Sequence, residues 1–506
     1  VRVGADVRLQ TMYSDYIAAG MKQYEETRDP DLAQRMFLAA EENRATAFRE
    51  KLLSSTPLPP EYWTTLAQLR QAEVSPQQNH PTPGSQLPQL RLRLVEFESK
   101  TGIGQKSLLI GQDTVSEWNS PKKRETKAES NALSVFQQKM LDTEALLSFH
   151  AGERGSYLWA ITRNSFEVRL LSSNAEIAER VAEFRRAILS DSPAQEALGT
   201  ELYRRLFGEV TPHVSGKRHW LLVLDGALFQ LPIAALRTPD SKYLVEHHSL
   251  RILPAAGMLL DRTKVPPARP GRGFMGVGDP IYNTADPRWN ARGIIASPGR
   301  SSPGGPGWAS MEFARLPASQ REIQACAAAW KSQVPPILLV GSQVERERVF
   351  AALSRQPEVA HFATHVAENP HSEGEFRIVL GLSPGGRPEF LTPGEIAASR
   401  YRLGLVALNG CNSGQGKALP GAGLIGLTRS WLICGAQAVA ATHWPTNDES
   451  GDLFKEFYRF AGRSGLPLSA ALSADALQAS QIEVLKSRTW HSHPKYWAAY
   501  FIVGKD

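Results

Sequence analysis

Short apolar runs separated by helical stretches fill nearly three quarters of the chain. Two of these runs, residues 359–365 and 405–414, are rich in Val, Leu, Ala and Phe and close with polar or small residues, which is typical of strands buried on both faces. Between them, Thr392 and Glu395 have the spacing of a capping box around Pro393, which predicts a short helix. This alternation predicts an α/β fold with a mostly parallel sheet flanked by helices.

The same periodicities predict the other elements of this region. Strands are expected at residues 157–162, 166–170, 219–226, 274–278, 337–340, 377–382, 436–441 and 498–503. Helices are expected at residues 174–190, 193–207, 317–331, 343–355, 421–434, 447–462 and 467–485. The first two strands flank a short polar turn and predict a hairpin.

Residues 1–55 carry a helical pattern instead. One apolar stripe runs along a first helix, and another runs along a helix that Asp29 caps with Pro30 at its first position. The stripes consist of Val7, Tyr13, Ile17, Met21 and Tyr24, and of Leu32, Met36, Ala40, Ala47 and Leu52. The two helices predict an αα-hairpin of the size of one tetratricopeptide-type repeat. Because one copy defines no period, a plain helical hairpin remains open.

A thiol and an imidazole follow the two central strands. His365 stands at the end of the first run, and Cys411 comes just after the apolar part of the second. If these strands are parallel neighbours, their carboxyl ends lie about 5 Å apart, and ligand chemistry in open α/β sheets collects at that edge. A nearby imidazole makes a thiolate available at neutral pH, which would permit acyl transfer through a thioester. The alternative interpretation is a buried, inert cysteine, which we also expect for Cys326 and Cys434.

Composition argues against several other environments and partners. The chain has 506 residues and 42% apolar content, but no apolar run long enough to predict a membrane-spanning helix. Three cysteines without CxxC spacing predict neither a disulfide framework nor a zinc cage, and they favour a cytoplasmic location. A net charge of +6 is modest for this length, so no nucleic-acid partner is expected.

Two patterns that look like ligand motifs lack the required context. Gly421 to Gly426 match GxGxxG, but no strand precedes them and no acidic residue follows at the expected strand end, so a nucleotide cofactor is not expected. His361 and His365 have HxxxH spacing without the glutamate of HExxH, and in a strand their side chains would point to unlike places. We therefore expect neither a metal nor a cofactor.

The motifs at both strand ends resemble those of the CHAT family of caspase-like cysteine peptidases, which is related to the separase and caspase group. Residues 361–365 (HFATH) look like its histidine motif, and residues 409–414 (NGCNSG) look like its cysteine motif. Further segments that resemble the family are residues 222–236, 423–427, 432–436, 443–448 and 493–500. The resemblance implies a caspase-like fold, with His365 as general base and Cys411 as nucleophile.

The resemblance also implies a division of the chain. Residues 133–506 correspond to the peptidase region, in which 133–255 form an upstream or pseudo-protease half and 256–506 carry the dyad. Residues 1–55 are then a helical hairpin, either a plain one or the end of a tetratricopeptide-like array. Residues 56–132 form a helical and loop-rich connecting segment.

The same resemblance implies roles for residues beside the dyad. The backbone N–H groups of Val366 and Cys411 are the expected oxyanion donors, although the family often has Gly at position 366 and a β-branched residue does not readily adopt a positive φ. Asn409 is expected on the wall of the substrate pocket, where its uncharged amide disfavours a charged residue before the cut. Asp225 and Asp448 are further candidates for substrate binding, and either would favour a basic residue.

These observations predict a cysteine endopeptidase that cleaves protein substrates through a Cys-His dyad, with a protein regulator bound at the helical segment. The alternative from another class is a catalytically silent scaffold of the same fold. A third class, an enzyme that uses NAD or ATP, lacks a convincing phosphate loop.

Overall fold

The computed structural model describes residues 2–55, 133–153, 155–208, 212–260, 272–290, 313–332, 334–369, 375–383, 385–410, 426–446 and 451–505. The predicted connecting segment, 56–132, lies outside these residues. The strands are β1 (Glu144–His150), β2 (Ser156–Ile161), β3 (Phe166–Leu171), β4 (His219–Val223), β5 (Ser249–Ile252), β6 (Phe274–Pro280), β7 (Ile337–Gly341), β8 (Val359–Ala363), β9 (Val366–Glu368), β10 (Phe376–Leu382), β11 (Pro388–Leu391), β12 (Leu405–Leu408), β13 (Ala438–Thr442) and β14 (Tyr500–Gly504).

The helices follow the predicted periodicity closely. The longer ones are α1 (Arg2–Thr27), α2 (Pro30–Ser55), α6 (Asn174–Leu189), α7 (Ala194–Leu206), α11 (Pro317–Trp330), α12 (Arg346–Ser354), α13 (Pro393–Ala398), α14 (Leu427–Cys434), α15 (Gly451–Arg463) and α16 (Ala470–Lys486). Short turns are α8 (Pro212–Ser215), η2 (Gly226–Gln230), η3 (Ile233–Ala235), α9 (Leu244–His247), η4 (Ala256–Leu259), α10 (Pro287–Asn290), η5 (Trp490–Ser492) and α17 (Pro494–Trp497). The predicted capping box opens α13, because Thr392 Oγ1 accepts from the Glu395 N–H and Glu395 Oε2 accepts from the Thr392 N–H.

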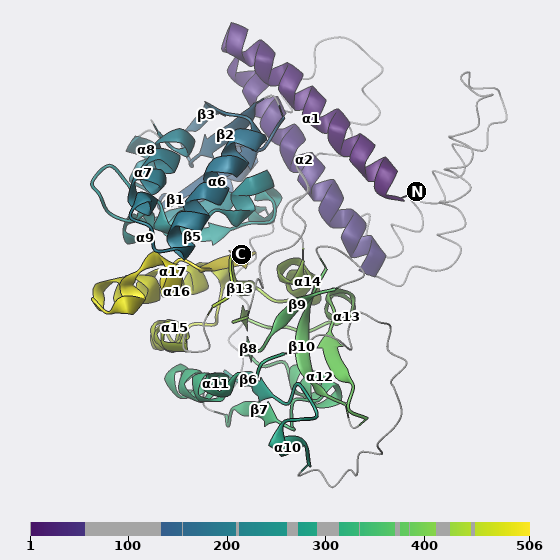
Figure 1. The fold of residues 1–506 in the computed structure, drawn as a ribbon. Coiled ribbons are helices and arrows are strands. Elements are labelled where there is room, and N and C mark those ends of the chain that lie inside the picture. Colours follow the sequence, from purple (N-terminus) through teal and green to yellow (C-terminus); the bar gives the residue numbers. More distant parts are fainter. Residues whose placement is uncertain are drawn as a thin grey trace, which may run out of the picture.

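One sheet of eleven strands organises the described part of the chain, in the order β3-β2-β1-β4-β5-β14-β13-β12-β8-β6-β7 (Figure 1). Neighbours from β1 to β14 are parallel, and so are neighbours from β13 to β7. The pairing of β13 with β14 is antiparallel, so these two blocks run in opposite directions. We call strands β1 to β5 the upstream half, and β6 to β8 with β12 and β13 the downstream half; β14 lies between the two halves and is parallel to β5.

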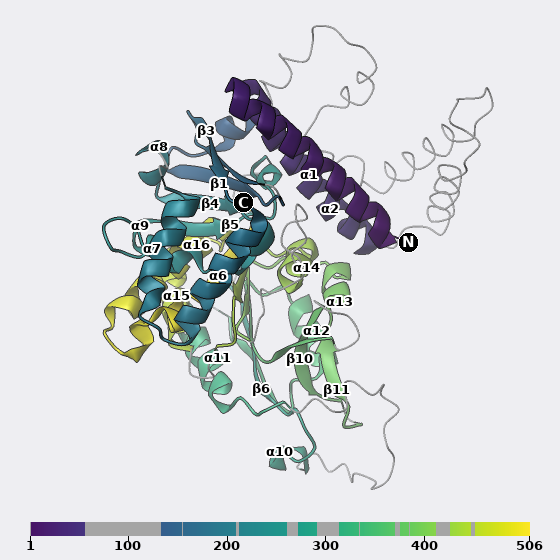
Figure 2. The ribbon, with the colours of Figure 1, turned by 45° about the horizontal axis from the view of Figure 1, so that its top comes forward.

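Each half of the sheet carries helices on both faces (Figures 1 and 2). In the upstream half, α6 and α7 cover one face and the hairpin α1-α2 covers the other. In the downstream half, α11 and α15 pack on the face toward which His361 points, and α14 packs on the face toward which Phe362 points. A second sheet, in the order β11-β10-β9, follows β8.

The helical hairpin packs against the upstream half of the sheet. Ile17 and Met21 of α1 are fully buried in a cluster that includes side chains of β1, β2 and β4. The Phe37 ring of α2 meets Phe136 and Trp159 edge to face, with centroids 5.6 and 6.0 Å away. The buried parts of the apolar stripes therefore pack on the chain's own sheet. The side chains of Val7, Ala47 and Leu52, also assigned to these stripes, lie outside the described part of the chain.

A buried ion pair fixes α2 to the sheet. Arg44 and Glu41 lie one turn apart on α2 and are each 1% exposed. Arg44 donates hydrogen bonds to Ser148 Oγ (3.1 Å) and to the Phe149 carbonyl, and Glu41 accepts one from the Ala256 N–H (2.6 Å). Buried charges are tolerated only where partner groups compensate for the lost water. Here β1 and η4 supply those groups.

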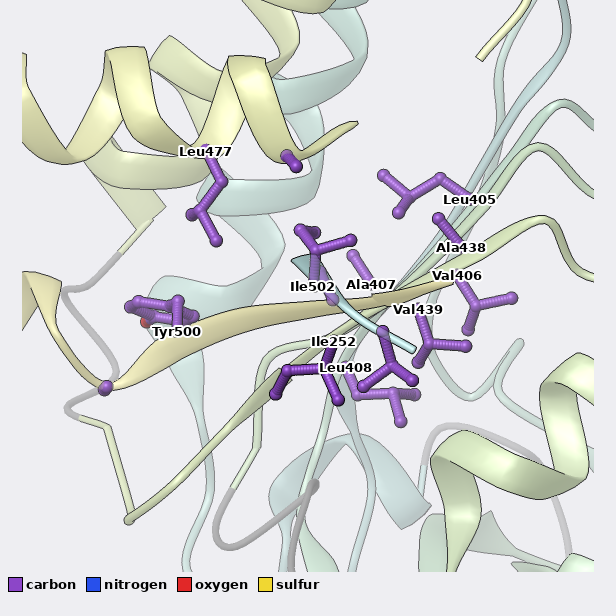
Figure 3. Packing of buried hydrophobic residues seen from close by; sticks show 14 of the residues in the cluster. Ile252, Leu405, Val406, Ala407, Leu408, Ala438, Val439, Leu477, Tyr500 and Ile502 are labelled. Carbon is purple, nitrogen blue, oxygen red and sulfur yellow. The ribbon is translucent and has the colours of Figure 1, made fainter. Parts of the chain in front are cut away.

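β14 joins the two halves into one sheet. It pairs with β13 over its whole length and with β5 through Val503 and Ile252. Figure 3 shows the apolar side chains that meet at this junction, among them Val439, Leu477 and Ile502. α16 lies across both β5 and β14. The junction is therefore part of the core and not a linker.

The predicted fold class is confirmed, because a mostly parallel sheet flanked by helices follows a helical segment. The predicted hairpin is β2-β3, with Ile161 opposite Phe166. The helix expected at 421–434 is described from Leu427 onward, and 421–425 lie outside the described residues. In the described part of the chain, no helix has the length and apolar character needed to cross a membrane.

Candidate active site

His365 follows the inner strand β8 and is held by groups from outside that strand. Its Nε2 lies 2.7 Å from the carbonyl oxygen of Ala314, and its backbone N–H donates to the Tyr282 hydroxyl (3.3 Å). The rings of Tyr282 and Phe313 lie 4.9 and 5.5 Å from the imidazole, centroid to centroid. Because a carbonyl oxygen only accepts hydrogen bonds, Nε2 carries the proton and Nδ1 is the basic nitrogen of the neutral ring.

The end of β12 packs directly on the loop after β8. The Asn409 N–H donates to the Phe362 carbonyl (2.9 Å), which continues the parallel pairing of β12 with β8. A Cβ at Gly410 would lie 2.4 Å from the carbonyl oxygen of Thr364, so only glycine permits this close approach. Cys411 is the next residue, and it lies outside the residues that the structure describes.

Val366 begins β9 directly after His365. Its side chain is 8% exposed, and its Cγ2 would lie 3.1 Å from a Cβ at Gly410. It pairs with Ile378 of β10 and is not among the residues with positive φ. The valine therefore occupies an extended strand position, which suits a β-branched residue.

The Asn409 amide belongs to a buried polar network beneath the strand ends. Its Nδ2 donates to Glu322 Oε1 (2.7 Å), and its Oδ1 accepts from the hydroxyls of Thr446 and Tyr500 (both 3.0 Å). Asn409 is 8% exposed and Glu322 is 6% exposed. The amide is thus oriented by the protein's own groups, and its place on a pocket wall stays a prediction.

His361 points into the core, away from the surroundings of His365. Its Nε2 lies 2.8 Å from Glu322 Oε1, and its Nδ1 lies 2.9 Å from the Tyr458 hydroxyl. Burial raises the pKa of Tyr458 well above its usual value, so this phenol stays neutral. The two histidines have unlike surroundings because β8 ends at Ala363, so that His361 lies within the strand and His365 follows it.

Glu322 is a buried polar residue next to the candidate site that sequence reasoning missed. It lies on α11 beside the buried residues Ile323, Cys326 and Trp330. A carboxylate at a core position of an amphipathic helix is rare unless it is paired. That position was the signal in the sequence that could have indicated it.

Asp225 and His365 lie at opposite ends of the strands of the sheet. Asp225 follows β4, which runs in the opposite direction to β8 and is five strand positions away, about 24 Å at the usual strand spacing. Its carboxylate accepts from the Ala151 N–H (2.9 Å) and lies 3.6 Å from His150 Nδ1. The structure therefore does not bring Asp225 to His365. Asp448 lies outside the described residues.

Cys326 and Cys434 are buried free thiols. Burial raises the pKa of the Cys326 thiol well above its usual value, and it also raises that of Cys434. A thiol of this kind is a poor nucleophile at neutral pH. Both positions agree with the core roles expected from the sequence.

A protein-family model described as the CHAT domain matches residues 196–505. This range contains the whole downstream half, with His365 and Gly410, together with β4 and β5 of the upstream half. The family match therefore covers both elements that frame the candidate site.

Similar proteins also include a curated relative and two solved structures. Tetratricopeptide repeat protein 28 of Mus musculus is 26% identical over 326 residues, which is 58% of this chain and 12% of the relative. The human protein of that name matches equally. The separase–securin complex of Saccharomyces cerevisiae has a TM-score of 0.42 and 11% identity, covering 93% of this chain and 40% of the other. The Arg specific cysteine proteinase gingipain R has a TM-score of 0.34 and 9% identity, covering 65% and 74%.

Proposed function

Because the chain belongs to the CHAT domain family, we propose that it is a cysteine endopeptidase with His365 as general base and Cys411 as nucleophile. The observation that carries the proposal is the hydrogen bond between His365 Nε2 and the Ala314 carbonyl (2.7 Å), which makes Nδ1 the basic nitrogen. The packing of Gly410 on Thr364 adds support, because Cys411 is bonded to Gly410.

In the proposed reaction, His365 Nδ1 takes the proton of the Cys411 thiol, and the sulfur attacks the carbonyl carbon of a peptide bond. The N–H groups of Val366 and Cys411 donate hydrogen bonds to the oxyanion, and losing one such donor typically costs about 100- to 1,000-fold in rate. The leaving amine takes the proton from Nδ1, and water then hydrolyses the thioester. The Ala314 carbonyl accepts from Nε2–H throughout and keeps the ring in one orientation.

The proposed substrates are proteins cut after uncharged residues. Asn409 carries no charge, and its amide is already oriented by Glu322 and Tyr500. A neutral wall leaves a charged side chain without a counterion, which is unfavourable in a buried pocket. Fluorogenic peptides that differ only in the residue before the cut test this preference. We expect Leu or Met first, Arg second and Asp last, and an Asp substrate turned over fastest would contradict it.

A protein regulator at the helical segment remains part of the proposal, and we place it on the outer face of α1. The inner stripes of the hairpin are buried, whereas Met12 and Tyr16 on the outer face of α1 are 66% and 48% exposed. Contiguous exposed apolar surface is typical of contact sites, and Met12 and Tyr16 are neighbours one turn apart on the same face of α1. Replacing both residues by Ser should therefore reduce partner capture without changing the reactivity of Cys411.

A catalytically silent scaffold is the second candidate, and Val366 is the observation that favours it. Its position in β9 is extended, whereas the family often has Gly there. Alkylation by iodoacetamide separates the two candidates, because it reports on the thiolate before any substrate is known.

We expect Cys411 to be alkylated faster than Cys326 and Cys434, with a pH midpoint below about 8. The burial of the other two thiols makes them slow internal references within the same sample. Mass spectrometry of the peptides gives all three rates. His365→Gln should move the midpoint for Cys411 upward, and the control His491→Gln should not. Equal midpoints in the wild type and His365→Gln would favour the scaffold.

Cleavage itself is tested by mapping new protein N-termini in cells. The wild type should generate termini that are absent with Cys411→Ala. The control Cys434→Ala removes a thiol from the core region and should retain them. Identical termini with the wild type and Cys411→Ala would overturn the proposed activity.

A further inference from the structure

The carbonyl that binds His365 belongs to a segment that lies outside every helix and strand. Residues 313–316 precede α11, and Ala314 itself is exposed. No ladder of backbone hydrogen bonds therefore fixes the direction of the Ala314 carbonyl. If His365 is to keep one tautomer, another group must hold the Ala314 carbonyl in its direction.

Arg315, the next residue, supplies such a group. Its Nε donates to Asp279 Oδ1 (3.0 Å) and its terminal nitrogen donates to Asp279 Oδ2 (2.8 Å). A bidentate pair of this kind fixes orientation as well as distance. Arg315 is half exposed, but Asp279 is only 1% exposed and lies at the end of β6, the neighbour of β8.

The backbone of Asp279 is also linked to residues 313–316 by hydrogen bonds. Its N–H donates to Ser319 Oγ (2.8 Å), and that hydroxyl donates to the Leu316 carbonyl (2.6 Å). The segment is thus held at Arg315 and at Leu316, the two residues that follow Ala314. The hydrogen bond to Asp279 raises the pKa of Arg315, so this guanidinium stays charged.

Arg288 completes the surroundings of the carboxylate. Its terminal nitrogens donate to Asp279 Oδ2 (2.7 Å) and Oδ1 (3.2 Å), and its Nε donates to Asp286. Four guanidinium hydrogen bonds therefore converge on Asp279. The carboxylate is an anchor with little freedom to rotate.

From these contacts, and on the premise of the proposed function, we infer that Arg315 and Asp279 are positioning residues that aim the Ala314 carbonyl at His365 Nε2. They touch neither substrate nor reacting atoms. They act by keeping the proton on Nε2, so that Nδ1 is the base. Without Arg315, the carbonyl is free to turn away and both tautomers of the imidazole become populated.

The first measurement is the tautomer of His365, which does not depend on activity. Protein with ¹⁵N-labelled histidine gives ring-nitrogen NMR signals, and those of His365 are assigned by their loss in His365→Gln. In the wild type we expect the Nε2–H tautomer to dominate. Arg315→Ala should lower its fraction, and Arg315→Lys, which keeps the charge but lacks the fork, should lie between. The control Arg348→Ala removes a surface arginine paired with Glu345 (3.5 Å) and should change nothing.

The second measurement is the rate of Cys411 alkylation by iodoacetamide at pH 7. A misplaced catalytic group costs up to about 100-fold in rate, so we expect Arg315→Ala to lose about 10- to 100-fold. Asp279→Asn should behave similarly, and if it fails to fold, Arg315→Ala and Arg315→Lys still decide.

The outcomes separate the two proposals. If the wild type holds the Nε2–H tautomer, Arg315→Ala loses it, and Cys411 is unreactive throughout, the positioning role stands and the peptidase does not. If Arg315→Ala keeps both the tautomer and the alkylation rate of the wild type, the positioning role is overturned. Circular dichroism confirms that the compared variants are folded.

Discussion

Glu322 links the two strands that frame the candidate site. His361 of β8 and Asn409 at the end of β12 both bind its Oε1 within 2.8 Å. Because a carboxylate only accepts, His361 carries its proton on Nε2, and its Nδ1 then accepts from the Tyr458 hydroxyl (2.9 Å). The network is thus directional from Tyr458 to Glu322, and each member depends on the next.

Removing this carboxylate should destabilise the protein. In Glu322→Ala, the His361 and Asn409 donors lose their buried acceptor, and each such loss costs about 1–3 kcal/mol. We therefore expect a loss of about 2–6 kcal/mol in the free energy of unfolding, measured with urea. The exposed Glu483→Ala on α16 is the control and should stay within about 0.5 kcal/mol. A loss for Glu322→Ala no larger than that of the control would contradict the network.

Three buried histidines predict loss of stability in acid. Burial lowers the pKa of His150 and His248 to about 4 and that of His443 to about 3. Between pH 6.5 and these values the unfolded chain binds more protons than the folded chain. The free energy of unfolding should therefore fall as the pH drops from about 6.5 toward 4, by up to about 1.4 kcal/mol per pH unit and histidine.

Urea unfolding at several pH values measures this slope. His443→Phe removes one titrating group and should make the slope shallower. Phe501→Leu removes a ring that lies tilted against His443, with centroids 4.4 Å apart, and should lower stability without changing the slope. Parallel curves for the wild type and His443→Phe would show that His443 does not titrate on unfolding.

At the scale of elements, local sequence patterns predicted individual helices and strands, but they did not predict which elements pack against one another. The capping box of α13, the hairpin β2-β3 and the buried strands β8 and β12 all follow from short-range spacing. The packing of the helical hairpin on the sheet does not follow from short-range spacing, because the contact between Arg44 and Ser148 joins residues 104 positions apart in sequence. Periodicity shows that a face is buried, but it carries no information on the surface that covers it. For the same reason the pattern could not reveal the pairing of Arg315 with Asp279, and it carried no information on the distance between Asp225 and the dyad.

The anchorage of the hairpin gives a prediction at this scale. Arg44→Met leaves Glu41 buried without its counterion, which typically costs about 3–5 kcal/mol. Arg180→Met is a matched control, since Arg180 and Glu183 form a pair of the same spacing on the surface of α6. Surface pairs contribute about 0–1 kcal/mol. Denaturant titration followed by circular dichroism gives both values, and equal losses would mean that α2 is not held by its buried pair.

At the scale of the whole molecule, the reversal between β14 and β13 gives the two halves opposite orientations. The strand end that carries His365 and the strand end that carries Asp225 therefore lie at opposite edges of one sheet. The halves nevertheless share a continuous core, in which Ile502 and Val503 are fully buried. The opposite strand directions thus keep His365 and Asp225 apart, while the shared core holds the two halves together.

We expect this shared sheet to unfold in one step. Scanning calorimetry should give a single transition whose calorimetric and van't Hoff enthalpies agree. Ile502→Asp buries a charge at the junction and should raise amide exchange in β4 and β12 together. Leu466→Asp, at a residue 62% exposed, should leave both unchanged. Two transitions, with exchange raised in only one half, would show that the halves are independent.

The position of β14 also determines when the sheet can be completed during synthesis at the ribosome. β14 follows the other ten strands in sequence, yet it lies between β5 and β13. About 250 residues separate Ile252 from Tyr500, and at roughly 5–20 residues per second their translation takes on the order of 10–50 s. Until then β5 is an edge strand, and unpaired edges bind other chains. We therefore expect the nascent upstream half to expose the edge of β5 during that interval, when it can pair with other chains.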